Sequence, residues 1–99
     1  MAEYTTNISW TNKEKNILKD NYFIVLRVFD TYWEIQSKNT GQLWLIKKSI
    51  INLGKVSLYH KHSSNTNYYH LQTHIGSVLE AISIIKAHDR YTLNLLYKN

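Results

Sequence analysis

Four of the five histidines in this chain lie within residues 58–74, together with three tyrosines and a lysine. Imidazole is the side chain that most readily acts as an acid, a base, a cation or a metal ligand near neutral pH. This histidine-rich stretch is therefore the part of the sequence in which chemistry is first expected. Its residue types alone do not select one of those roles.

The histidine-rich stretch is predicted to form a β-hairpin. Residues 63–67, Ser-Ser-Asn-Thr-Asn, have the composition of a turn, and strands are expected at about residues 55–61 and 67–73. The register set by this turn gives the pairs His60–His70, His62–Tyr68 and Leu58–Gln72. Three of the histidines then share one face of the hairpin, and the reverse face carries Tyr59, Lys61, Tyr69 and Leu71.

The shared face resembles, in spacing alone, the three-imidazole zinc site of carbonic anhydrases. Its ligands would be His60, His62 and His70. However, this face carries no carboxylate to accept hydrogen bonds from the rings, and the nearby lysines oppose binding of a dication. We therefore predict no metal and no other cofactor.

Two further interpretations of the histidines remain open. In the first, His60 and His70 act as general acid and base while a lysine holds a phosphate during RNA cleavage. Small basic RNA-cleaving bacterial toxins resemble this chain in size and charge, but no motif matches theirs, so no catalytic residue is assigned. In the second, each histidine is a hydrogen-bonded packing residue of an ordinary sheet.

The charge pattern favours a binding function over an enzymatic one. The net charge is +5, and no Asp or Glu occurs from Ile35 through Leu79, so a polyanion is the expected partner. Tyrosine and histidine rings can stack on the bases of a single strand while lysines contact phosphates. The predicted nucleic-acid-binding residues are Lys47, Lys48, Lys55, Tyr59, His60, Lys61, His62, Tyr68, Tyr69 and His70. A single surface carrying Lys47, Lys48, Lys55 and Lys61 would support this hypothesis, and scattered lysines would weaken it.

The elements that position these residues are predicted from capping and periodicity. Thr11 and Glu14 have the spacing of a capping box, which predicts a helix over about residues 12–20. Alternating residues then indicate strands joined by turns at 30–31 and 38–41. This register pairs Val28 with Trp33, Leu26 with Ile35, Ile24 with Ser37, Arg27 with Glu34, Ile35 with Trp44 and Trp33 with Ile46. The predicted sheet core consists of Tyr22, Ile24, Leu26, Val28, Trp33, Ile35, Trp44 and Ile46.

The other face of this sheet is predicted to be partly apolar, with Phe23, Val25, Leu43 and Leu45 among polar residues. Large exposed apolar patches are rare on soluble monomers, so a homodimer formed through these four residues is expected. The alternative function is accordingly a protein-interaction or regulatory module. The absence of proline and the many Lys, Asn, Ile and Tyr residues suggest AT-rich coding DNA, as in low-GC bacteria, phages or other mobile elements.

The C-terminal part is predicted to be a helix that begins at Ser77, follows an apolar stripe and ends near Asp89. His88 is then a helix-end cation, and Asp89 and Arg90 form a surface ion pair of little energetic weight. The tail after Tyr91 is expected to be either a strand or a continuation of the helix. The fold class is therefore α+β, a meander of about five antiparallel strands with a short N-terminal helix and a C-terminal helix on the sheet.

The length and composition favour one cytoplasmic domain. A chain of 99 residues supports a single modest core. It contains no apolar run of about 18 residues and no leader-like N-terminus. The absence of cysteine excludes disulfides, thiolate catalysis and cysteine-type zinc sites.

Overall fold

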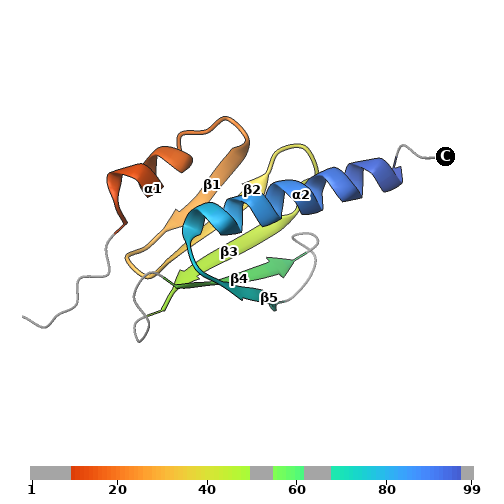
Figure 1. The fold of residues 1–99 in the computed structure, drawn as a ribbon. Helices are drawn as coiled ribbons and strands as arrows, with labels where there is room; N and C mark the ends of the chain where they lie inside the picture. The colour runs from red at the N-terminus through yellow and green to blue at the C-terminus, as the bar shows by residue number, and fades with distance from the viewer. Residues whose placement is uncertain (1–9, 50–54, 62–67, 97–99) are drawn as a thin grey trace, which may run out of the picture.

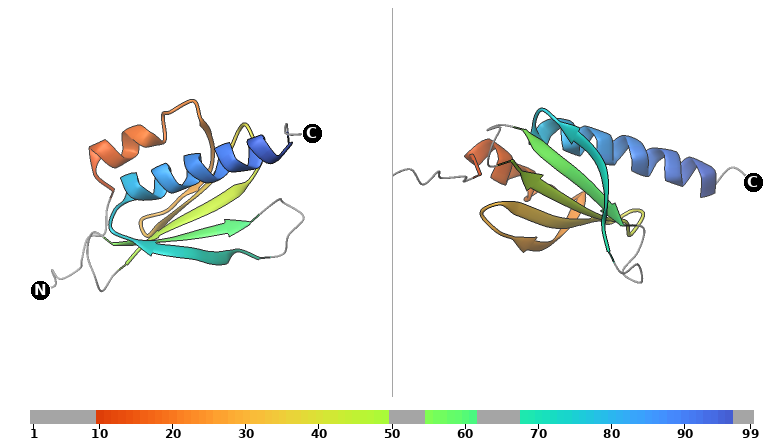
Figure 2. Two further views of the ribbon diagram at one scale, coloured as in Figure 1. Left: turned by 45° about the vertical axis from the view of Figure 1, so that its right-hand side comes forward. Right: turned by 90° about the horizontal axis from the view of Figure 1, so that it is seen from below.

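The chain forms one antiparallel sheet with two helices on the same face (Figure 1). The computed structural model describes residues 10–49, 55–61 and 68–96. Consecutive strands are neighbours in the sheet, in the order β1-β2-β3-β4-β5, and the view from below in Figure 2 shows the sheet in front of both helices. The predicted α+β meander is therefore confirmed. We call the face that packs on the helices the inner face and the opposite one the outer face.

Helix α1 (Asn12–Ile17) begins where the capping box predicts. The Thr11 hydroxyl accepts from the backbone N–H of Glu14 at 3.1 Å, and the Glu14 carboxylate accepts from the N–H of Thr11 at 2.9 Å. The helix ends three residues earlier than predicted, because the N–H groups of Leu18, Lys19 and Asp20 bond three residues back, as in a tightened last turn. None of its own residues is buried.

Strands β1 (Phe23–Val28) and β2 (Tyr32–Ser37) pair as predicted near their turn and differently beyond it. Val28 pairs with Trp33 and Arg27 with Glu34, but the register shifts between Val25 and Arg27. The bulge places one extra residue, Leu26, in β1. The side chains of Phe23, Ile24 and Val25 therefore point to the faces opposite to those predicted. Phe23 therefore enters the core in place of Ile24. The predicted core positions Ile24, Leu26 and Val28 are wrong, since all three are exposed, and Tyr22 is half-buried.

Strand β3 (Leu43–Lys48) follows the predicted register throughout. Trp33 pairs with Ile46 and Ile35 with Trp44, and all four side chains are fully buried. The turn between β2 and β3 closes at Gly41, whose φ of +76° is a conformation that favours glycine.

Strands β4 (Val56–Lys61) and β5 (His70–Ile75) complete the sheet. His60 pairs with His70, as predicted. A register shift between Leu58 and Tyr59 places Leu58 opposite Thr73, so the predicted Leu58–Gln72 pair is wrong. The pairing of His62 with Tyr68 and the turn at 63–67 lie outside the described residues.

Helix α2 (Val78–Leu96) packs on β3, β4 and β5. The Ser77 hydroxyl caps it by accepting from the N–H of Glu80 at 3.2 Å. The helix continues seven residues past the predicted end at Asp89, so the tail is helical and its last turn carries no basic residue. Neither helix in the described part of the chain has the length and apolar character needed to cross a bilayer.

The predicted apolar surface of Phe23, Val25, Leu43 and Leu45 does not form. The bulge puts Phe23 in the core cluster and pairs Val25 with the buried Ile35, so both belong to the inner side. Leu43 and Leu45 point to the outer face, where Leu43 is buried and Leu45 half-buried. These four residues therefore do not make one dimer surface.

Candidate nucleic-acid interface

Of the predicted histidine pair, His60 lies under helix α2, whereas His70 is exposed. The ring centroids of His60 and His70 are 5.6 Å apart, but His60 is only 1% exposed. Its ring stacks on Trp44 at 4.2 Å and contacts His88 of α2 at 4.7 Å. His60 therefore belongs to the packing between the sheet and α2, as the packing interpretation predicts.

Hydrogen bonding fixes the orientation of His60. Its Nε2 bonds to the side-chain carbonyl of Gln42, and a carbonyl only accepts, so Nε2 carries the proton. The Gln42 amide in turn donates to the Thr92 hydroxyl at 3.2 Å. A buried imidazole held in this way does not reach an external RNA phosphate, so the geometry gives no support to His60 as a general acid or base.

His88 is not the helix-end cation that the sequence predicts. Because α2 extends to Leu96, His88 lies within the helix, edge-on to Trp44 at 5.3 Å. Its Nδ1 is buried, without a hydrogen-bond partner among the described residues. Together with His60 and His70 it makes an imidazole cluster, but no three His, Asp or Glu side chains in the described ranges are placed to hold a metal ion. His62, the third predicted ligand, lies outside those ranges.

Asp89 is also not the surface residue that the sequence predicts. It is fully buried and accepts hydrogen bonds from the Tyr22 hydroxyl at 2.6 Å and the Thr40 hydroxyl at 2.9 Å. Burial, reinforced by the bond to Asp89, raises the pKa of Tyr22 to about 12. The predicted Asp89–Arg90 ion pair is therefore replaced by a buried polar link between α2 and the sheet.

The outer face retains the other part of the predicted interface. Lys47, Tyr59 and Lys61 alternate with inner residues along β3 and β4, so all three side chains lie on this face. Neither helix covers it (Figure 2). Strand pairing extends the set to Tyr32, opposite Lys47, and to Arg27 in the row of Tyr59.

Charges on the outer face are predominantly positive. Glu34 is the one acid in the five strands. It forms an ion pair with Arg27 at 3.4 Å and accepts a hydrogen bond from the Tyr69 hydroxyl at 2.7 Å. Burial and the bond to Glu34 raise the pKa of Tyr69, which keeps its hydroxyl neutral as a donor. Lys61 lies 4.9 Å over the Tyr69 ring, so Tyr69 is fixed beside this face.

The four predicted lysines do not share one surface. Lys48 points to the inner face, where its ammonium contacts Glu14 at 3.0 Å and lies 4.6 Å over the Trp10 ring. Lys47 and Lys61 share the outer face but are separated along the strands, and Lys55 precedes β4 at the end near Lys47. This scattering of the lysines weakens the hypothesis of one continuous basic surface. A smaller surface remains on the outer face, where Lys47 and Lys61 lie among tyrosines.

The remaining described residues of the predicted nucleic-acid interface are exposed at the start of β5. Tyr68 is 73% exposed just before β5, and His70 is exposed next to the buried His60. Arg27 and Tyr32 are the outer-face residues that were not selected from the sequence. The alternation of the sequence already placed both residues on the face of the sheet away from the predicted core. They were not selected because that face was expected to form an apolar dimer surface.

Comparison of the chain with protein-family models, with curated proteins and with solved structures finds no match.

Proposed function

We propose that this protein binds single-stranded nucleic acid on the outer face of its sheet. The observation that carries this proposal is the position of Tyr32, Tyr59, Lys47 and Lys61 on a face that neither helix covers. Tyrosine rings provide stacking surfaces for bases of any sequence, and the lysines provide contacts to phosphates. The proposal no longer includes Lys48 and His60, which belong to the inner face.

The dimensions and charge of the face suit a flexible strand. Lys47 lies beside Ser57, four residues along β4 from Lys61, so the backbone positions of the two lysines are separated by about 13 Å along the strand direction. Tyr59 lies between them. Glu34 carries the only strand carboxylate and is already bound to Arg27, so repulsion of phosphates is limited.

A titration of fluorescent single- and double-stranded DNA and RNA at two salt concentrations tests the proposal. Single strands are expected to bind at low salt and to dissociate as salt rises, because phosphate contacts release counterions. Tyr59→Ala is expected to weaken binding about tenfold through loss of one stacking contact, whereas Tyr59→Phe keeps the ring and the affinity. Equal affinities for both variants would contradict a stacking role.

A second candidate function is self-association, and strand β1 is the surface that favours it. β1 is an edge strand, and Ile24, Val25, Leu26, Val28 and Phe29 are each 39–49% exposed there. An exposed apolar edge is a template for pairing with another strand. We infer that a second copy of β1 is the occupant, because an antiparallel copy centred on Leu26 covers these exposed apolar side chains with an identical apolar set.

Sedimentation of the full chain and of Leu26→Lys tests this second function. Leu26 is the bulge residue and is exposed, so the lysine leaves the core unchanged while placing two like charges at the centre of the pairing. The expected result is a dimer that becomes a monomer in the variant. A parent protein that remains monomeric at high concentration would refute self-association through β1.

A further inference from the structure

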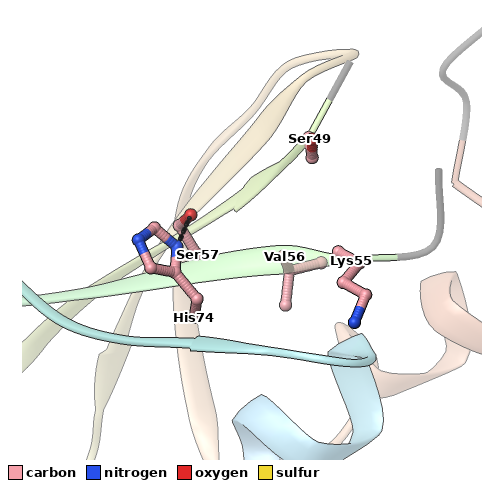
Figure 3. A pocket seen from close by; sticks show the side chains of 5 residues that line it. All are labelled: Ser49, Lys55, Val56, Ser57 and His74. Carbon is pink, nitrogen blue, oxygen red and sulfur yellow. Dashed lines mark hydrogen bonds between the residues drawn. The ribbon is translucent and has the colours of Figure 1, made fainter. Parts of the chain in front are cut away.

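A cavity of about 310 Å³ lies at the end of the sheet where β3 finishes and β4 begins (Figure 3). Its lining consists of Ser49, Lys55, Val56, Ser57 and His74. The volume is at the small end of the range for ligand sites. Among the described residues, this lining contains one lysine, one histidine and two hydroxyl groups, and no acid. Its chemistry therefore suits a small anion.

Strand pairing builds the cavity from residues far apart in the sequence. The N–H of Ser49 donates to the carbonyl of Lys55 at 3.0 Å, which holds the ends of the two strands together. His74 reaches across from β5 and bonds through Nδ1 to the Ser57 hydroxyl at 2.8 Å. Figure 3 shows this pair at one end of the cavity and Lys55 at the other, with its side chain turned away from the pair.

Through this hydrogen bond, the protonation state of the His74 imidazole determines whether the Ser57 hydroxyl can donate to a bound anion. When the imidazole is neutral and Nδ1 accepts, the Ser57 proton is committed to His74. When the imidazole is protonated, Nδ1 donates instead and the Ser57 hydroxyl is free to donate to an anion. An anion therefore favours the cationic imidazole, which gains a charge-assisted partner.

The cavity is continuous with the outer face. Tyr32, Lys47, Ser57 and His74 pair successively across β2, β3, β4 and β5 and so form one row of that face. The titratable residues of this row and of the described cavity lining are Tyr32, Lys47, Lys55 and His74, and none is a carboxylate. A single-stranded nucleic acid that runs along the outer face past Lys47 would end at this cavity.

We propose that the cavity binds a terminal phosphate of the nucleic-acid strand, an inference that rests on the function proposed for the outer face. A terminal phosphate monoester carries nearly two negative charges near neutral pH, whereas each internal phosphodiester carries one. Lys55 and the protonated His74 supply the cations, and Ser57 supplies a hydroxyl donor. Binding of the terminal phosphate is tighter when His74 is protonated.

The test compares oligonucleotides of one sequence with a 5′-phosphate, with a 3′-phosphate and with neither. One of the two phosphorylated ends is expected to bind about tenfold more tightly than the unphosphorylated strand. The advantage disappears in Lys55→Ala and Ser57→Ala and persists in Lys13→Ala, a control on the exposed surface of α1.

Inorganic phosphate, followed by the His74 ring resonances, separates failure of this inference from failure of the proposed function. If all three oligonucleotides bind equally and phosphate leaves those resonances unmoved, the cavity is not a phosphate site although the outer face still binds. If no oligonucleotide binds but phosphate shifts His74, the anion site stands, and the terminal-phosphate assignment is overturned together with the proposed function. If neither binds, both proposals are refuted.

Discussion

The carboxylate of Asp89 links three separate parts of the chain. It lies on α2 and accepts hydrogen bonds from Tyr22, just before β1, and from Thr40, in the turn between β2 and β3. Hydrogen bonds to a buried charged group contribute more than those between neutral groups, and an orphaned donor costs its full desolvation. This one side chain therefore fixes where the distal half of α2 lies on the sheet.

Asp89→Ala is expected to lower the free energy of unfolding by about 2–3 kcal/mol, because it removes the acceptor of two hydrogen bonds. Arg90→Ala changes the next residue, which is exposed, and should stay within about 0.5 kcal/mol of the parent protein. Urea denaturation of the three proteins measures both values. Equal stabilities for the two variants would contradict the buried link.

The environments of individual residues were only partly predictable from the sequence. The His60–His70 pair follows from strand alternation, and so does the burial of Trp33 and Trp44. The environment of His88 does not, because the apolar stripe of α2 stops at Ile85 and polar residues continue it. The helical spacing of that stripe continues through His88, Asp89 and Thr92. A search for apolar residues alone does not detect this continuation, because these three side chains are polar.

At the scale of elements, Trp10, which precedes the N-cap Thr11, is a buried attachment of α1 to the sheet. Trp10 stacks on Trp33 at 4.2 Å, donates from its ring N–H to the carbonyl of Phe29 at 2.7 Å and lies under the ammonium of Lys48. The helix itself buries none of its residues. An anchor outside the periodic segment explains why the helical pattern alone did not identify Trp10 as core.

Trp10→Ala is expected to lower the free energy of unfolding by about 3–5 kcal/mol, the range for removing a buried aromatic side chain. Thr11→Ala removes only the cap and should cost about 1 kcal/mol. Thermal or urea unfolding of both variants gives the comparison. A cap substitution as costly as the tryptophan substitution would mean that α1, rather than Trp10, carries the attachment.

The order of the elements was predictable, whereas the face of β1 was not. Turns at residues 30–31 and 38–41 determine which strands are neighbours, and the structure keeps both. The bulge at Leu26 could not be anticipated, because Phe23, Ile24, Val25 and Leu26 are all apolar and either face of the strand satisfies the pattern. Only the fit of Phe23 into the core selects one of the two faces.

At the scale of the whole molecule, the sheet separates two kinds of chemistry. The inner face holds the tryptophans, the imidazole cluster and the ion pair of Lys48 with Glu14, all of which stabilise the fold. The outer face holds tyrosines and cations beside a single strand carboxylate. The net charge of +5 favours association with polyanions in general, but the outer face is where we propose that a strand is held.

Lys47 and Lys48 provide the most direct test, because consecutive residues of β3 point to opposite faces. The measurement is the affinity for single-stranded nucleic acid as a function of salt concentration. It is made for the parent protein, Lys47→Ala and Lys48→Ala, without denaturant and under conditions in which all three proteins are folded. The account predicts that Lys47→Ala weakens binding and reduces the slope of log affinity against log salt by about 0.7. Lys48→Ala should keep the parent slope and lose stability instead. Absence of binding at low salt, or a reduced slope in Lys48→Ala alone, would contradict an interface on the outer face.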